Sequence, residues 1–287
     1  MKNLRTLLNL VLCLPLASCA LEAADPNIEQ LGAAAEEIKN GTVGWHPGVV
    51  AVYHGGVRPC SGVYMGQGPR GAEWVLTARH CVTTDGSVSG PLMSASSLWV
   101  TAQDNPGLTV PSLAFRQSKQ YWQQGTQIVQ RSSTTDLALL RLGAPLRYLS
   151  PITGNNLVIH ASAVSINTPP SSLINKDVEC AGYGRSTNLS LPLNVEDGTT
   201  GAGRARWARV RINSANSTRF TAPINSLGQT IINGDSGGPC WVVHSHGKVL
   251  VGINKSTNSP SSPTVGTFVT VAGNANANWV DNIIQGS

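Results

Sequence analysis

The sequence predicts an all-β fold, and three observations support this prediction. Short apolar runs recur from residue 38 onward between clusters of Gly, Pro, Asn and Ser, whereas sustained helical periodicity is scarce. The 287 residues include 30 Gly and 17 Pro, and only 12% are charged. This composition excludes a coiled coil and a charge-rich disordered chain, and it disfavours a helical bundle. So many short strands indicate a β-sandwich or β-barrels.

The predicted strands are, in chain order, Val49–Tyr53, Trp74–Thr77, Leu98–Thr101, Leu137–Leu142, Val158–Ile166, Val178–Ala181, Ala205–Ile212, Trp241–Val243, Val249–Ile253 and Thr267–Val271. Ala275–Ile284 is predicted to form a helix, because Trp279, Ile283 and Ile284 fall on one face. Pro145–Pro151 is expected to connect the two halves of the strand series.

Residues 1–19 are predicted to be an export signal with a positively charged start. The apolar core Leu7–Leu16 is shorter than the roughly 20 residues that a membrane-spanning helix needs. Leu16–Cys19 resembles the lipobox of bacterial lipoproteins, which implies a lipid anchor at Cys19 in a bacterial membrane, facing the periplasm or the cell surface. The alternative is ordinary cleavage after Ala20 and secretion. Both interpretations place the protein outside the cytoplasm, where disulfides persist.

Residues 20–37 form an acidic segment with five Asp or Glu residues and no Lys or Arg. The rest of the chain, 38–287, holds 18 basic and 10 acidic residues, so an acidic leader precedes a basic body. Two interpretations of this leader remain open. It is either a solvated linker or short helix, or a pro-segment that is removed on activation.

Three short motifs contain candidate catalytic residues. They are His80 in Trp74–Cys81, Asp136 in Thr135–Leu142 and Ser236 in Gly234–Pro239. Each alone has a structural explanation, as a packed histidine, a turn cap and a tight loop. Together, in the order His, Asp, Ser in a β-rich chain with an export signal, they resemble the motifs of the chymotrypsin/trypsin family of serine proteases.

This resemblance covers residues 38–287 and implies a fold of two six-stranded antiparallel Greek-key β-barrels with a short C-terminal helix. The first barrel would span about 38–148 and the second about 149–287. The resemblance also implies serine endopeptidase activity on protein or peptide substrates. It implies no cofactor and no metal, and we expect a monomer.

The chemistry of this family explains the residue types. The Ser236 hydroxyl is a weak nucleophile, and His80 offers a base whose ordinary pKa lies near neutral pH. A buried carboxylate at Asp136 would orient the imidazole and stabilise its charged form. The backbone N–H groups of Gly234 and Ser236 would form the oxyanion hole that holds the tetrahedral intermediate.

The same resemblance implies two disulfides. Pro59–Gly62 matches the family's strand before the His motif, which pairs Cys60 with Cys81. Cys180 opens the segment that begins the second barrel, and Cys240 follows the Ser motif, so these two would also pair. The alternative is that the four cysteines are free buried thiols.

The residues from Ile38 to Gly41 resemble the mature amino terminus of the family. The resemblance implies a zymogen that is cut between Glu37 and Ile38, after which the new α-amine pairs with Asp235. Lys39 departs from the family, which usually has an apolar residue there. The alternative is that Ile38 begins an ordinary loop.

The family's substrate pocket maps onto Thr230 at its base, Gly266 on the opposite strand and Lys255, Ser256 and Thr257 along its wall. Neither Thr230 nor Gly266 is acidic. The sequence therefore predicts non-tryptic specificity and a pocket for apolar side chains. The wall departs from the family's Ser-Trp-Gly, so either the alignment slips within Asn254–Pro263 or this wall is rebuilt. This departure raises the alternative of an acidic substrate side chain, which agrees with the Glu before the predicted activation bond.

Two further features have simpler interpretations than ligand binding. His244–Lys248 lies between two predicted strands, so we interpret it as an exposed hairpin turn rather than a metal site. The chain also contains a near-alternating basic run of Arg204, Arg206, Arg209 and Arg211. We interpret this run as the solvated face of a strand, not as a nucleic-acid site.

Two rival functions share the fold. A catalytically silent relative could act as a binding module, although such relatives usually lack a triad residue and all three are present here. Arg79 beside His80, where the family usually has a small residue, and Lys255 are the departures that favour this rival. An esterase would use the same triad on a different substrate.

Overall fold

The computed structural model describes residues 41–43, 48–54, 58–102, 121–149, 156–159, 161–184, 205–232, 234–257 and 264–287. The chain divides into units 1–34 and 35–287, and all described residues belong to the second unit. The predicted export signal, Cys19, the acidic segment 20–37 and Ile38 lie outside the described residues. No helix in the described part of the chain is long and apolar enough to cross a membrane.

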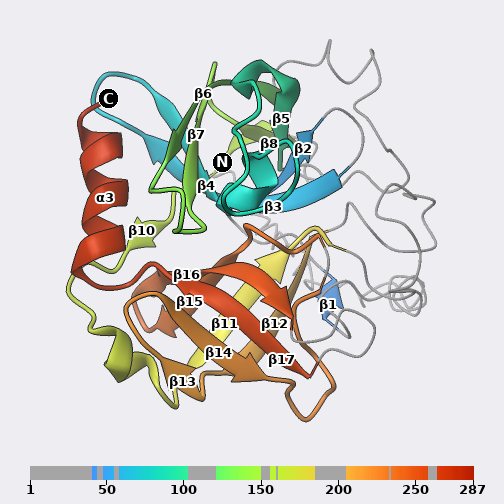
Figure 1. The fold of residues 1–287 in the computed structure, drawn as a ribbon, viewed down its shortest axis with the longest axis vertical. Coiled ribbons are helices and arrows are strands. Elements are labelled where there is room, and N and C mark those ends of the chain that lie inside the picture. The colour runs from blue at the N-terminus through green and yellow to red at the C-terminus, as the bar shows by residue number, and fades with distance from the viewer. Residues whose placement is uncertain are drawn as a thin grey trace, which may run out of the picture. The chain divides into compact units, whose positions relative to one another are not determined.

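Six strands close into an antiparallel barrel, as the sequence predicts for the first half of the domain (Figure 1). In barrel order they are β2 (Val49–His54), β3 (Arg58–Gln67), β4 (Glu73–Thr77), β7 (Ala138–Leu142), β6 (Trp122–Gln130) and β5 (Leu98–Thr101). The apolar run in β2 does not alternate with polar residues, because neither face of this strand meets solvent. Val50 and Val52 join one hydrophobic cluster, while Val49, Ala51 and Tyr53 join another, so both faces of β2 are buried.

The second half of the domain is a half-barrel built from a nine-stranded sheet. Its path is β1 (Thr42–Val43), β12 (Arg206–Arg211), β11 (Asp177–Gly182), β15 (Pro239–His244), β16 (Gly247–Thr257), β17 (Val265–Thr270), β14 (Arg219–Pro223) and β13 (Ser214–Ala215). A further strand, β10 (Ala163–Val164), pairs in parallel with β16.

The two-barrel architecture that the resemblance implies is confirmed. Among the described residues, the hydrogen-bonded path of this half-barrel ends in the two-residue strands β1 and β13. A side-chain bond from Asn225 Nδ2 to the Arg209 carbonyl, 2.9 Å long, connects the region after β14 to β12 across the open side. β1 precedes the first barrel in the chain but pairs with the second sheet.

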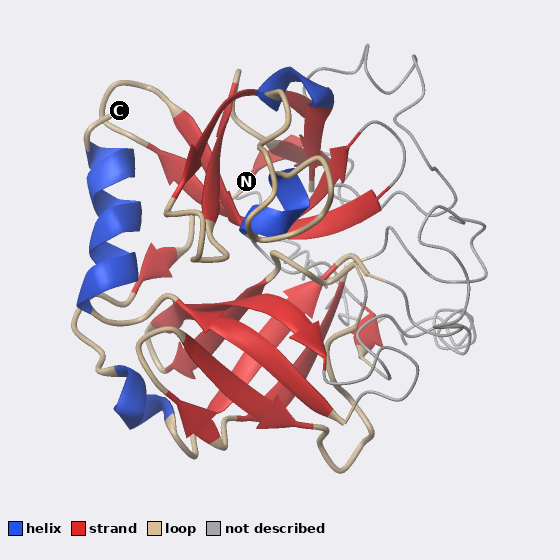
Figure 2. Ribbon diagram, viewed as in Figure 1, coloured by secondary structure: helices blue, strands red, loops and turns tan. Residues whose placement is uncertain are grey.

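Short elements complete the domain (Figure 2). They are the ladder of β8 (Arg147–Leu149) with β9 (Asn156–Val158), the 3-10 turns η1 (Arg79–Val82), η2 (Ala95–Ser97) and η3 (Pro170–Leu173), and the helix α3 (Asn274–Gln285). The predicted C-terminal helix is confirmed. The predicted strand Val158–Ile166 is wrong, because the described residues of this segment form only the end of β9 and the two-residue β10.

One hydrophobic cluster connects the two sheets and the helix. It includes Trp74 and Leu76 of the first barrel, Trp241 and Ile253 of the second sheet, and Val280 of α3. Burial of these large side chains stabilises the packing of one sheet on the other. The three motifs that the sequence singles out come from both sheets, so the site depends on this packing.

Candidate active site

Two neighbouring strands bring His80 and Asp136 together. In the β4–β7 pair, Thr77 lies opposite Ala138, and His80 follows β4 on η1 while Asp136 lies just before β7. The His80 Nδ1 atom lies 2.9 Å from Asp136 Oδ2 and 3.1 Å from Oδ1. The backbone N–H of His80 also donates to Asp136 Oδ1 at 2.9 Å.

The Asp136 carboxylate is buried and stays ionised at neutral pH. Burial acts to raise its pKa, but the hydrogen bonds and charge of His80, with a contribution from the charge of Lys255, hold the pKa of Asp136 below its ordinary value. An ionised carboxylate can only accept hydrogen bonds, so Nδ1 of His80 must carry the proton. The neutral imidazole is then left with Nε2 as an acceptor.

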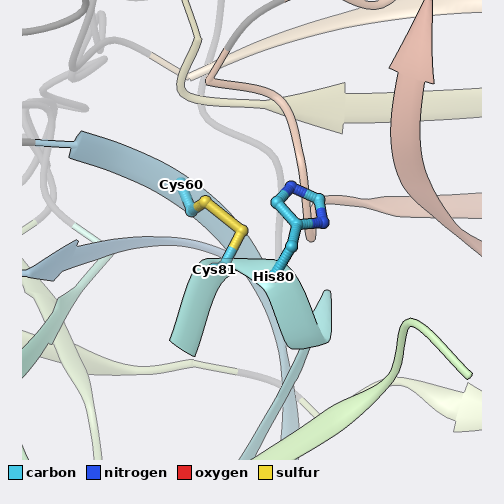
Figure 3. A group of neighbouring side chains, drawn as sticks. All are labelled: Cys60, His80 and Cys81. Carbon is cyan, nitrogen blue, oxygen red and sulfur yellow. A yellow bond between two sulfur atoms is a disulfide. The ribbon is translucent and has the colours of Figure 1, made fainter. Parts of the chain in front are cut away.

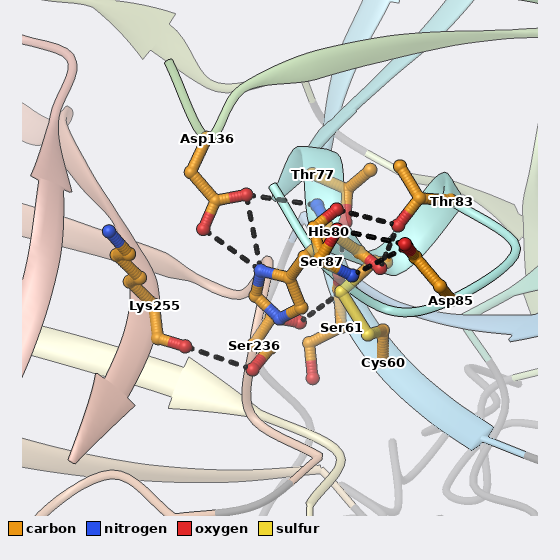
Figure 4. A network of polar contacts seen from close by, with 11 residues as sticks. Cys60, Ser61, Thr77, His80, Thr83, Asp85, Ser87, Asp136, Ser236 and Lys255 are labelled. Atoms are coloured by element: carbon orange, nitrogen blue, oxygen red, sulfur yellow. Dashed lines mark hydrogen bonds and ion pairs between the residues drawn. A yellow bond between two sulfur atoms is a disulfide. The ribbon is translucent and has the colours of Figure 1, made fainter. Parts of the chain in front are cut away.

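The imidazole of His80 lies between Asp136 and Ser236, with its second nitrogen toward the Ser236 side chain (Figure 4). The Ser236 hydroxyl donates to the Lys255 carbonyl at 3.1 Å. This is the bond that the hydroxyl makes among the described residues. The three residues that the sequence predicts as a triad are therefore assembled at one place.

The turn that carries Ser236 requires glycine. Gly234 and Gly237 have φ values of 94° and 85°, in the left-handed region that favours glycine. A Cβ at Gly237 would lie 2.2 Å from Ser61 O and from Thr77 Oγ1, so no other residue fits there. Among the described residues, no hydrogen bond uses the backbone N–H of Gly234 or Ser236.

Ser61 of β3 links the first barrel to this turn, a connection that the sequence did not indicate. Its backbone N–H donates to Ser236 O at 2.7 Å, and its Oγ donates to Gly234 O at 2.9 Å. The same Oγ accepts the N–H of Tyr183 at 2.8 Å. The side chain is fully buried, so these bonds are shielded from water. Ser61 thus holds the Ser236 turn against the barrel that carries His80.

Asp235 belongs to the same turn, and its side chain is buried. Its Oδ2 accepts the N–H of Ile232 at 2.8 Å, and its Oδ1 accepts the N–H of Gly184 at 3.0 Å. Burial raises the pKa of Asp235 to about 7, although these two N–H groups and the charge of Arg206 act to lower it. Ile38, its predicted partner, lies outside the described residues.

The predicted solvated face of the basic run is wrong at Arg206, whose exposed fraction is 0%. Arg209 and Arg211 are exposed as predicted, and they pair with acidic residues of the neighbouring strand β11. Arg204 lies outside the described residues. Alternate residues of β12 do lie on opposite faces, as the sequence predicts. However, the face that carries Arg206 points into the protein.

The predicted pocket wall is shaped by a β-bulge. The register of β16 against β17 shifts between Asn254 and Ser256, so Lys255 is the extra residue. The bulge turns its carbonyl toward Ser236, while its side chain extends on the Asp136 side (Figure 4). Lys255 therefore lies beside the predicted triad.

The other predicted pocket residues lie on β16, β17 and the segment before Ser236. Thr257 is opposite Gly266 in the β16–β17 pair, and Ser256 precedes it. A Cβ at Gly266 would lie 3.2 Å from Ile231 Cγ1, which places the neighbour of Thr230 against this strand. Thr230 is buried, and its hydroxyl has no hydrogen-bond partner among the described residues.

Both predicted disulfides are present. Cys60 bonds to Cys81, and Cys180 bonds to Cys240, which lies directly opposite it in the β11–β15 pair. Cys60, His80 and Cys81 cluster as three potential metal ligands (Figure 3). Because the two sulfurs are bonded to each other, they are not thiolates, and this cluster is not a metal centre. The Cys60–Cys81 bond instead fastens η1, which holds His80, to β3.

Arg79, an unusual neighbour for the predicted base, is buried behind it. Its Nε donates to Gln130 Oε1 at 2.6 Å, and its Nη2 donates to the Gly90 carbonyl at 2.9 Å. The side chain thus joins η1 to β6 and to the loop after η1. Its guanidinium is therefore held by Gln130 and Gly90.

The remaining prediction outside the site concerns His244–Lys248. β15 and β16 pair through His244 and Gly247, and the residues at their junction are exposed, so the predicted hairpin turn is confirmed.

A comparison with protein families agrees with the fold and with this constellation. The family model described as Trypsin matches residues 37–280, which is most of the chain and includes all three predicted triad residues. The chain belongs to the trypsin family of serine proteases.

Proposed function

We propose that this protein is an exported serine endopeptidase that hydrolyses peptide bonds through Ser236, His80 and Asp136. The observation that carries the proposal is the double hydrogen bond of His80 to the buried, ionised Asp136, on the side of the imidazole away from Ser236. This arrangement leaves Nε2 free to accept a proton from the nucleophile.

In the first half of the reaction, the Ser236 hydroxyl turns from the Lys255 carbonyl to His80 and attacks the scissile carbonyl carbon. The Oγ–C bond forms as the hydroxyl proton moves to His80 Nε2. The carbonyl π pair becomes the oxyanion of a tetrahedral intermediate. When that intermediate collapses, the C–N bond breaks and the imidazolium gives its proton to the leaving amine, so an acyl-enzyme remains on Ser236.

In the second half, water replaces the amine. His80 takes a proton from the water as it attacks the acyl carbon, and returns it to Ser236 Oγ as the ester bond breaks. The backbone N–H groups of Gly234 and Ser236, which are unused among the described residues, would donate to the oxyanion in both halves. In another enzyme, removal of one such donor raises the activation barrier by about 2.7–4 kcal/mol.

Substrate preference in this proposal is non-tryptic. Thr230 and Gly266 supply no carboxylate for an Arg or Lys side chain, and the apolar Ile231 follows Thr230. The side chain of Lys255 extends beside Asp136, which supports an apolar preference over the acidic alternative, because its charge is directed to the triad. The two disulfides support a location outside the cytoplasm, where such bonds persist. Anchoring through Cys19 remains a prediction.

A peptide library tests the function and the preference together. The wild-type protein and its Ser236→Ala variant are incubated with the library, and the new C-termini are identified by mass spectrometry. The proposal predicts cleavage after large apolar residues by the wild type alone. Cleavage after Arg or Lys would contradict the non-tryptic preference, and a preference for Glu would favour the acidic alternative. Ester hydrolysis without peptide hydrolysis would favour the esterase, and no turnover of either would favour the binding module.

A further inference from the structure

A hollow with a volume of about 420 Å³ lies on the first barrel, and this volume is typical of a ligand-binding site. Arg141 lines the hollow and lies near the end of β7, whereas Asp136 precedes the start of that strand. At the rise of an extended strand, the two residues are roughly 16 Å apart. The hollow is therefore separate from the predicted triad.

Strand register builds one wall of this hollow. Arg141 on β7 lies opposite Trp74 on β4 and opposite Gln127 on β6, and directly opposed residues share a face of the sheet. Val129 follows Gln127 on β6 at the strand period, so it shares this face as well. Because Arg141 is exposed, this is the outer face of the barrel.

The end of α3 and the turn between β3 and β4 form the other wall. Figure 1 shows the C-terminal end of α3 beside this turn, and the backbone N–H of Arg70 donates to Ser287 O at 2.7 Å. The indole N–H of Trp74 donates to Ser287 Oγ at 2.8 Å. These bonds hold the turn against the helix, and Arg70 and Ile283 both line the hollow.

The hollow carries two guanidinium groups that are not used within the protein. Arg70 and Arg141 are exposed, and in the described part of the chain neither side chain makes a hydrogen bond or an ion pair. Arg209 and Arg211 on the second sheet differ, since both pair with acidic residues of β11. Two planar guanidinium groups at one site favour a carboxylate, to which each can donate paired hydrogen bonds.

The rest of the lining is apolar except for one amide. Val129 and Ile283 are half-buried, and the N–H of the Trp74 side chain is already bonded to Ser287. These three side chains therefore offer an apolar surface. Gln127 adds an exposed amide, which can both donate to and accept from a peptide group. The lining fits a carboxylate that lies beside an apolar side chain on a polypeptide.

We propose that this hollow is a second binding site, which takes a polypeptide segment with an Asp or Glu beside a large apolar residue. Arg70 and Arg141 bind the carboxylate, and Trp74, Val129 and Ile283 contact the apolar side chain. The inference rests on the proposed function in taking a polypeptide substrate as the ligand. The segment that binds here lies away from the bond that Ser236 attacks.

The experiment measures peptide binding by fluorescence anisotropy in the full chain carrying Ser236→Ala, so that no peptide is cleaved. The probe is a short, blocked and labelled peptide of alternating Glu and Leu. The comparison peptides replace every Glu by Gln, every Glu by Lys, or every Leu by Ser. All peptides with Leu can enter the predicted substrate pocket, so only the dependence on Glu reports on the hollow.

The variants, made in the Ser236→Ala chain, are Arg70→Met, Arg141→Met and the double variant Arg70→Glu/Arg141→Glu. Arg219→Met is the matched control, because Arg219 is also an exposed strand arginine but does not line the hollow. Both arginines of the hollow are exposed, so these variants should stay folded, and thermal denaturation verifies this.

We expect the Glu–Leu peptide to bind more tightly than the Gln–Leu and Glu–Ser peptides. Arg70→Met and Arg141→Met should each weaken its binding by about fivefold, the effect of losing one partly exposed ion pair. The double variant should prefer the Lys–Leu peptide, which a general loss of structure would not produce. Arg219→Met should leave all four affinities unchanged.

Equal binding of the Glu–Leu and Gln–Leu peptides would overturn the inference, and so would a double variant that binds the Glu–Leu peptide as tightly as its parent. Octanoate tests a small anion as the ligand. If it displaces the peptide at a concentration below the peptide's own Kd, the hollow binds such anions and the polypeptide inference is wrong. These results do not depend on catalysis, whereas a wild-type chain that takes up no fluorophosphonate would reject the proposed function.

Discussion

The carboxylate of Asp136 holds His80 at two points, since it accepts the ring Nδ1–H and its Oδ1 also accepts the backbone N–H of the same residue. The backbone bond fixes the start of η1, and the ring bond fixes the tautomer. Asp136 thus sets both where the imidazole lies and which nitrogen faces Ser236. Neither bond depends on substrate, so the proposed base is oriented before substrate binds.

Asp136→Asn should abolish most activity while the protein stays folded. The amide is nearly the same size, but it can donate to Nδ1 and so favours the wrong tautomer of His80. We expect kcat to fall by about 10⁴, as for the corresponding change elsewhere in this family. Steady-state kinetics on a peptide substrate measure the loss. Asp85→Asn, an exposed change shortly after η1, is the matched control. An Asp136→Asn variant within tenfold of wild type would contradict the assigned tautomer.

The raised pKa of Asp235 predicts that the free energy of unfolding depends on pH in an unusual way. Its pKa is about 7 in the folded protein and ordinarily 3.8, so the folded state binds more protons than the unfolded state between these values. Its contribution to the free energy of unfolding therefore falls as pH rises from about 4 to about 7. Chemical denaturation across this range should show a steeper loss for the wild type than for Asp235→Asn. Parallel curves for the two proteins would show that Asp235 titrates normally.

Ser61→Ala should lower stability and activity together. It removes the Oγ–H bond to Gly234 O and the acceptor for the Tyr183 N–H, both in a fully buried site. The cost is about 1–3 kcal/mol in the free energy of unfolding. The loosened turn should also lower kcat/KM, which separates this change from a purely structural loss. Ser172→Ala, an exposed serine on η3, is the control that should change neither quantity.

The two disulfides should have different effects on activity. Cys180→Ala/Cys240→Ala opens a loop with a sequence separation of 60, which lowers the free energy of unfolding by about 4 kcal/mol. Cys60→Ala/Cys81→Ala opens a shorter loop, with a separation of 21, and should cost about 3 kcal/mol.

Only the second pair of substitutions releases η1, which carries His80. At a temperature where both variants remain folded, kcat should therefore fall more in Cys60→Ala/Cys81→Ala. Denaturation curves and kinetics on the same samples make the comparison. An equal loss of kcat in both variants would show that the Cys60–Cys81 bond does not position the base.

The sequence predicted the assembled site because each candidate residue belongs to a local motif. His80 and Asp136 flank β4 and β7, whose apolar runs fix their register, and the glycines around Ser236 permit one tight turn. Local motifs of this kind are enough to predict the site, because pairing of neighbouring strands brings their ends, and the motifs at those ends, together.

Other features depended on tertiary contacts that no local pattern reveals. β6 reads Trp-Gln-Gln-Gly-Thr-Gln-Ile-Val-Gln, too polar to be identified as a strand, yet it is hydrogen-bonded between β5 and β7. Alternation in β12 indicated two faces. It could not show that the face carrying Arg206 is buried, where the charge of Arg206 acts on Asp235. The bulge at Lys255 arises from the pairing of β16 with β17, so its position was invisible in the sequence.

The central claim is that Ser236 is a nucleophile activated by His80. The most direct measurement is the stoichiometry and site of fluorophosphonate labelling, read by intact mass and by peptide mapping. The account predicts one phosphonyl group per chain, located on Ser236, with labelling lost in Ser236→Ala and slowed at least a thousandfold in His80→Ala. A folded wild-type chain that takes up no label, or that labels equally well without His80, would contradict it.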